Sequence, residues 1–204
     1  YVSSEAVLAS ENVFFSEYHA KQEAFELTMH PFCRNAVAAM DWGGTIMNKY
    51  LSKDNKSRHR RYTTDVFEMA SAIMNQAAIQ CIAIYPNNLS ELPQHEIDFL
   101  KSVPTTWDET VPLEGEVGEY IALARRHNDT WYIGVINGAT PRHIEIDLSF
   151  IGNGPKKIKA HIDGVNAGQQ AKDSQIIEQV IKDNEKLPID MSRGGGYTGI
   201  IHIE

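Results

Sequence analysis

Two glutamates near the start of the chain, Glu5 and Glu11, have the residue type and spacing best suited to chemistry. They stand six positions apart in the stretch YVSSEAVLASE. Hydrolysis of a glycosidic bond needs two carboxyl groups, one to protonate the leaving oxygen and one to attack or to activate water. Glutamate suits the first role because burial can raise its pKa toward the working pH. The alternative is that both are solvated helix residues, which is where most glutamates lie.

The elements around these glutamates determine whether they can meet. Ser3 or Ser4 can cap a short helix through EAVLASE, with Glu5 in its first turn. On an ideal helix a six-residue step turns the side chain by about 240°, so the two carboxylates would point in different directions. We therefore expect them to converge on one site only if this segment is irregular or bends into a cleft.

A second candidate group is the pair Asp41-Trp42, which is followed by two glycines. We expect a helix over residues 20–29, ended by Pro31, and then a short buried strand over Asn35–Met40 that leads into this pair. Polar residues at strand ends are where α/β barrels keep their chemistry. The alternative is a plain turn with a packed tryptophan.

An alternation of helix and strand continues up to about Pro104. Residues 48–61 are polar and predict a surface loop, and their basic run Arg58–Arg61 is expected to be solvated. A helix follows, capped by a residue between Thr63 and Asp65, with apolar residues at 66, 69, 70, 73, 74 and 77. The apolar run Cys81–Tyr85 predicts a strand of a parallel sheet, and residues 92–103 predict one more helix.

After Pro104 the pattern changes to apolar alternation interrupted by turn residues, which predicts an antiparallel β-sandwich. The fold class is therefore α/β followed by all-β, with one domain over residues 1–105 and a second over 106–204. The seven expected strands are Gly118–Arg125, Trp131–Asn137, His143–Leu148, Lys157–Ile162, Gln175–Ile181, Leu187–Met191 and Tyr197–Ile203.

Composition excludes several classes of function. The formal net charge of −8 over 204 residues argues against nucleic acid and anionic membranes as partners. The eight histidines form no HExxH pattern, and the two cysteines, Cys33 and Cys81, have no metal-ligand spacing. Both cysteines are expected to be buried free thiols, although a single disulfide is the alternative. There is no apolar run of 18 residues and no signal peptide pattern.

A set of motifs, in order along nearly the whole chain, resembles glycoside hydrolase family 97, whose members are calcium-dependent α-glucosidases and α-galactosidases. The motifs are S-E-A-V-x-x-x-E (Ser4–Glu11), H-P-F-x-R-N-x-V-x-x-M-D-W (His30–Trp42), W-D-E-T (Trp107–Thr110), G-E-Y-x-x-x-A-R-R (Gly118–Arg126), D-T-W-Y-x-G (Asp129–Gly134), D-G-x-N-A (Asp163–Ala167) and the closing G-G-G-Y.

The resemblance implies that residues 1–105 are the last part of a catalytic (β/α)₈ barrel and residues 106–204 a C-terminal β-sandwich domain. It implies that Glu11 is the general acid and that Glu5 is a ligand of Ca²⁺, a cation that takes oxygen ligands. Asp41 and Trp42 would line the sugar subsite, the tryptophan by stacking on a pyranose. The substrate would be an oligosaccharide, and the location periplasmic or secreted.

The chain also departs from the family pattern. The partner carboxylates of the family lie upstream of Tyr1, and Gly43-Gly44 stands where members often have Thr-Pro. We therefore expect either the C-terminal piece of a longer enzyme, completed by the upstream part of the same polypeptide, or a truncated, inactive relative. A competing hypothesis is a non-catalytic carbohydrate-binding module that uses exposed aromatic residues of the β domain, with a purely structural domain as a third. The candidate aromatic residues are Tyr120, Trp131, Tyr132 and Tyr197.

Overall fold

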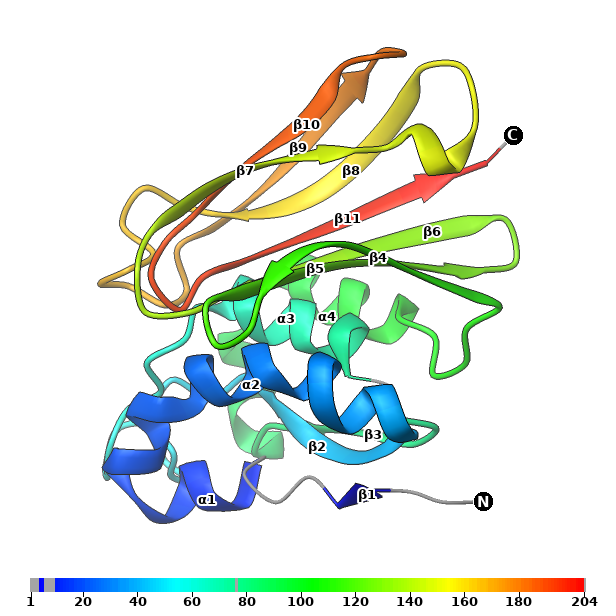
Figure 1. Cartoon of the computed structure of the whole chain (residues 1–204). Helices are drawn as coiled ribbons and strands as arrows, with labels where there is room; N and C mark the ends of the chain where they lie inside the picture. The colour runs from blue at the N-terminus through cyan, green and yellow to red at the C-terminus, as the bar shows by residue number, and fades with distance from the viewer. Residues whose placement is uncertain (1–3, 6–9, 76, 204) are drawn as a thin grey trace.

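A computed structural model of the chain describes residues 4–5, 10–75 and 77–203, with the backbone alone for Ser4, Glu5, Ser10, Glu11 and Asp41. The structure has four layers; in Figure 1 the two β layers lie above the helices and the short parallel strands lie below them. The four layers are the strand pair β7 (Arg142–Asp147) and β10 (Lys186–Met191), a six-stranded sheet, a layer of helices, and three short parallel strands.

The six-stranded sheet is antiparallel throughout and has the order β4-β5-β6-β11-β8-β9. All seven strands predicted after Pro104 are confirmed. Strand β4 was missed because its largely exposed sequence ETVPLEGE has few apolar residues and contains Pro112. The strands of this sheet are β4 (Glu109–Glu116), β5 (Tyr120–His127), β6 (Thr130–Asn137), β8 (Lys156–Asp163), β9 (Ser174–Ile181) and β11 (Gly196–His202). A short 3₁₀ turn, Ser149–Ile151, follows β7.

The strands β5 and β6 are buried on both faces, which joins the β domain to the rest of the chain. On one face, side chains such as Ile133 and Val135 pack under the β7–β10 pair. On the other face, Ile121, Leu123 and Ile136 pack against the helical layer. This explains why these antiparallel strands read as nearly continuous apolar runs rather than as alternating ones.

The helix α3 (Asp65–Met74) is the centre of the helical layer, and all of its residues are buried. The side chain of Thr64 caps it by accepting a hydrogen bond from the Phe67 backbone N–H, as the sequence predicts. A helix buried on every side needs apolar residues all round, and most of DVFEMASAIM meets that requirement. Its two carboxylates, Asp65 and Glu68, are the exceptions that need partners.

The helix α2 (Glu17–Val37) is longer than predicted and continues through Pro31. Proline removes one backbone hydrogen bond and costs about 3 kcal/mol inside a helix. Tertiary packing offsets this cost, because Leu27, Thr28 and His30 on the same helix are buried. The prediction that Pro31 ends the helix was therefore wrong.

The parallel strands also differ from prediction at the start of the chain. Glu5 lies in strand β1 (Ser4–Glu5) and not in a helix, and α1 begins only at Ser10 and ends at Phe15. The predicted strand over residues 35–40 is mostly the end of α2, and β2 spans Met40–Ile46. Asp41, Trp42 and the two glycines therefore lie inside a strand. The sequence did not show this, because a short apolar run such as residues 35–40 is compatible with both helix and strand.

The remaining elements of the first half agree with the sequence reading. Strand β3 (Gln80–Ala83) follows α3, and a 3₁₀ helix (Pro86–Glu91) leads to α4 (Gln94–Ser102). Both cysteines are free but exposed, so the expectation of buried thiols was wrong. None of the helices in the described part of the chain is long and apolar enough to span a membrane.

Candidate functional site

The three parallel strands carry the residues that the sequence singled out. In the order β1-β2-β3, the register pairs Ser4 with Met40 and Glu5 with Asp41. Asp41 is the second residue of β2, so it lies near the amino end of the strand and not at the carboxyl end. The prediction that it ends a strand and feeds a loop was therefore wrong, and Ile46 holds the carboxyl-end position.

Glu5 and Glu11 lie on two different elements. Glu5 is the last described residue of β1, and Glu11 is the second residue of α1. Because the chain changes from strand to helix between them, the geometric objection that applies to a single helix does not hold. The directions of their carboxylates, and that of Asp41, lie outside the part of the structure that is described, so their meeting stays a prediction.

The Trp42 indole is enclosed within the chain. It is 1% exposed, and its Nε1 lies 3.4 Å from the Thr45 hydroxyl. The His30 ring meets it edge-on at 6.0 Å, and a Cβ on Gly44 would lie 2.4 Å from the indole. A pyranose has no open ring face on which to stack here, because neighbouring groups already cover the indole.

The aromatic residues on which a carbohydrate-binding module would depend are buried as well. Each is at most 8% exposed, so the β domain does not present these rings as a platform for a sugar. The four side chains are Tyr120, Trp131, Tyr132 and Tyr197.

A buried network of charged groups holds the carboxyl end of β2. The Ile46 N–H donates to Glu68 Oε2 at 2.8 Å, and the Ile46 carbonyl accepts from the Arg61 guanidinium. Arg61 also pairs with Asp65, and the Thr63 hydroxyl donates to Glu68. Arg61 is 2% exposed, so the prediction that its basic run is solvated was wrong for this residue.

Burial controls the protonation of this network. Desolvation raises the pKa of Glu68 to about 7, although the charge of Arg61 opposes the shift. Glu23, buried beside it, has a pKa raised well above its usual range, first by desolvation and then by the charge of Glu68. Pairs of carboxyl groups with raised pKa values are common in active sites, but these two are enclosed by protein and support the fold.

Two further carboxyl groups join the helical layer to the β domain. Asp163 accepts hydrogen bonds from the Thr64 hydroxyl (2.7 Å) and from the backbone N–H groups of Ser192 (2.9 Å) and Gly196 (3.3 Å). Glu96 on α4 accepts one from the Ser174 hydroxyl on β9 at 2.7 Å. Desolvation raises the pKa of Asp163 to about 6. The pKa of Glu96 is raised to about 7, first by desolvation and then by the charge of Asp65.

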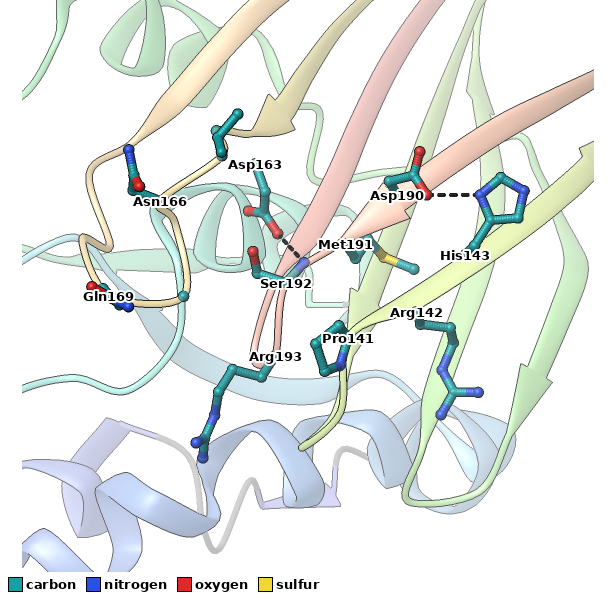
Figure 2. A pocket seen from close by; sticks show the side chains of 13 residues that line it. Pro141, Arg142, His143, Asp163, Asn166, Gln169, Asp190, Met191, Ser192 and Arg193 are labelled. Atoms are coloured by element: carbon teal, nitrogen blue, oxygen red, sulfur yellow. Dashed lines mark hydrogen bonds and ion pairs between the residues drawn. The ribbon is translucent and has the colours of Figure 1, made fainter.

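A hollow of about 780 Å³ opens beside Asp163, between the turn after β8 and the ends of β7 and β10. Figure 2 shows its walls, with the ion pair between His143 and Asp190 (2.7 Å) on one side and Gln169 and Arg193 on the other. Its lining combines polar and apolar surface, and sequence reasoning missed the hollow because the turns that form it are distant along the chain. Among the described residues, no three His, Cys, Asp or Glu side chains gather to hold a metal ion.

Comparison with known proteins places this chain. Residues 106–202 match the family described as "Glycosyl-hydrolase 97 C-terminal, oligomerisation". Through these residues the chain belongs to glycosyl-hydrolase family 97. The family 97 chain is also 31% identical, over 197 residues, to a retaining alpha-galactosidase of Bacteroides thetaiotaomicron. That match covers 95% of this chain but only 29% of the curated relative.

Several solved structures are also similar to this chain. A crystal structure of a beta-arabinopyranosidase is 38% identical, has a TM-score of 0.88, and is matched over 98% of this chain and 31% of its own. A family 97 enzyme from Pseudoalteromonas sp. strain K8, in complex with acarbose, is 23% identical with a TM-score of 0.76. It is matched over 88% of this chain and 28% of its own, and supports the fold alone.

Proposed function

We propose that this chain is part of a glycoside hydrolase that removes a terminal α-linked galactose- or glucose-type sugar from an oligosaccharide. The observation that carries the proposal is the 31% identity to a retaining alpha-galactosidase over 197 residues, which is 95% of this chain. Galactose is favoured, because one of the similar solved structures is a beta-arabinopyranosidase. Arabinopyranose of the L series has the ring of galactopyranose without its hydroxymethyl group.

Glu11 is proposed as the general acid that protonates the departing glycosidic oxygen. A retaining enzyme needs a second carboxylate as nucleophile, about 5–5.5 Å from the acid. We propose that this group lies in the upstream part of the same polypeptide, as the family resemblance implies. The three-stranded parallel sheet is consistent with this, because barrels of this class close with eight strands and the described part supplies three.

Glu5 is proposed as one ligand of a calcium ion. Its carboxylate is the oxygen donor that calcium prefers, and other donors must join it because calcium takes six to eight oxygen ligands. The register brings the backbone of Glu5 beside that of Asp41, so a second acidic residue lies on the neighbouring strand. Bound calcium would supply positive charge that orients a sugar hydroxyl. The periplasmic or secreted location stays a prediction.

The test uses the complete polypeptide that carries this chain. Glu11→Gln should lower the hydrolysis of a disaccharide by about 10²–10⁴-fold, and that of an activated aryl glycoside far less, because a good leaving group needs no proton. Glu17→Gln, an exposed glutamate at the start of α2, is the matched control. Equal loss, or no loss, on both substrates would remove Glu11 from this role. Glu5→Gln should weaken calcium binding, measured by titration calorimetry.

The family description favours a second role for residues 106–202, the association of copies of the enzyme. Light scattering on the complete polypeptide, and on a version that ends at residue 105, tests this role. We expect an oligomer for the first, and a monomeric complete polypeptide would contradict the proposal.

A further inference from the structure

A small basic hollow lies between the loop after β2 and the turn after β8. It has a volume of about 100 Å³, and its described lining includes four cations and no carboxylate. The cations are Lys49, Arg60, Arg61 and Arg193. This grouping is unexpected in a chain with 27 acidic and 19 basic residues. Like charges held close together repel one another, so an anion would stabilise the group.

Three of the four cations have charge available for a ligand. Arg61 is already occupied by Asp65 and by the carbonyls of Ile46 and Thr63. Lys49 and Arg60 lie over tyrosine rings, at 5.7 Å and 4.8 Å from the ring centres, which orients them without neutralising them. Within the described part of the chain, neither they nor Arg193 form an ion pair with a carboxylate.

The position of the basic hollow suits a ligand of the barrel face. The loop that carries Lys49 and Arg60 follows the carboxyl end of β2, and barrel enzymes bind their ligands at that end of the strands. Gly168, Gln169 and Arg193 also line the 780 Å³ hollow, so the two spaces adjoin. In Figure 2 the Arg193 side chain extends away from Asp163 toward the helices, on the side of Gln169.

We propose that the basic hollow is a binding site for an oxyanion group, which either an acidic sugar or a free phosphate can supply. Lys49, Arg60 and Arg193 supply the charge, and the guanidinium groups can donate paired hydrogen bonds to a carboxylate or phosphate. The adjoining hollow has the size of a small-molecule site and leaves room for the rest of a sugar ring. The site adds to the proposed function and needs no catalysis to be measured.

The experiment is titration calorimetry of the 204-residue chain with galacturonic acid, inorganic phosphate and neutral galactose, at low and high salt. We expect both anions, or galacturonic acid alone, to bind at low salt and more weakly at high salt, and galactose not to bind. Binding of galacturonic acid alone identifies an acidic sugar as the source, and comparable binding of phosphate identifies a free oxyanion. If neither galacturonic acid nor phosphate binds, or if galactose binds equally well, the proposal is overturned.

Variants then locate the site. Arg193→Ala should weaken anion binding by about fivefold, the upper end of the range measured for a single exposed charge pair. The double change with Arg60→Ala should weaken it by about 25-fold, because the effects of two independent pairs multiply. Arg193→Glu, which changes one exposed side chain, should abolish binding and guards against misfolding of the double variant. Lys53→Ala removes an exposed cation of the same loop that does not line the basic hollow, so binding should not change. Unchanged affinity in the double variant would refute the location.

Discussion

Glu96 offers a test of how the helical layer is joined to the β domain. Its side chain is fully buried, and only one of its oxygens accepts a hydrogen bond, from Ser174. Its Oε2 and the Asp65 Oδ2 are both buried without a hydrogen-bond partner in the described part of the chain, so a proton shared near them relieves two unpaired oxygens. Burial and the charge of Asp65 raise the pKa of Glu96 to about 7.

The raised pKa sets the sign of the effect. The folded state binds this proton more tightly than the unfolded state, so stability is full below about pH 4.5, falls as the pH rises to about 7, and is then constant. Raising the pKa of Glu96 from 4.5 to about 7 corresponds to about 3 kcal/mol as an upper limit. Glu96→Gln keeps an oxygen for Ser174 and places an amide donor near Asp65 at every pH, so it should remove this loss.

Urea unfolding of both proteins between pH 4.5 and 8.5 is the measurement. The stability of Glu96→Gln relative to wild type should increase by about 2–3 kcal/mol up to pH 7 and stay constant above it. Glu145→Gln, at an exposed position of β7, should show no such trend. A difference between Glu96→Gln and wild type that does not vary with pH would refute the reasoning.

Three further perturbations test the packing. Gly196→Ala would place a Cβ 2.7 Å from the backbone of α3 and should cost about 2–3 kcal/mol in urea unfolding, whereas Gly168→Ala, whose nearest contact is 3.9 Å away, should not. Asp163→Ala leaves three hydrogen-bond donors without their acceptor and should cost about 3 kcal/mol; a loss below about 1 kcal/mol would contradict this. Cys33 and Cys81 are free and exposed, so a thiol reagent should titrate both in the folded chain, and a single reactive thiol would contradict the structure.

The sequence predicted the elements that local signals define. The strands from β5 to β11 have alternation or apolar runs bounded by turn residues, and α3 has a cap and a regular apolar spacing. Prediction from sequence failed where tertiary contacts determine the secondary structure. Pro31 signals the end of a helix, but the buried side chains beside it keep α2 continuous.

The candidate site was only partly open to sequence reasoning. Paired-carboxylate chemistry and a family resemblance identified Glu5 and Glu11 as candidates. Neither predicted that Glu5 lies on a strand and Glu11 on a separate helix. Arg61 was read as solvated because a basic run carries no sign of its buried partners Asp65 and Glu68, which lie in the next helix. The basic hollow was missed because Arg193 reaches it from a turn more than a hundred residues away.

The double attachment at Ile46 limits which strands can pair with β2. The Met47 N–H bonds to Ala83 of β3, so the backbone groups of Ile46 point away from β3, toward the β1 side. Glu68 and Arg61 already occupy both of those groups. A strand that pairs with β2 on the β1 side must end before it reaches Ile46. If it extended as far as Ile46, it would displace the buried side chains of Glu68 and Arg61. The pair thus acts as a register stop for β1, the strand beside β2 on this side of the parallel sheet.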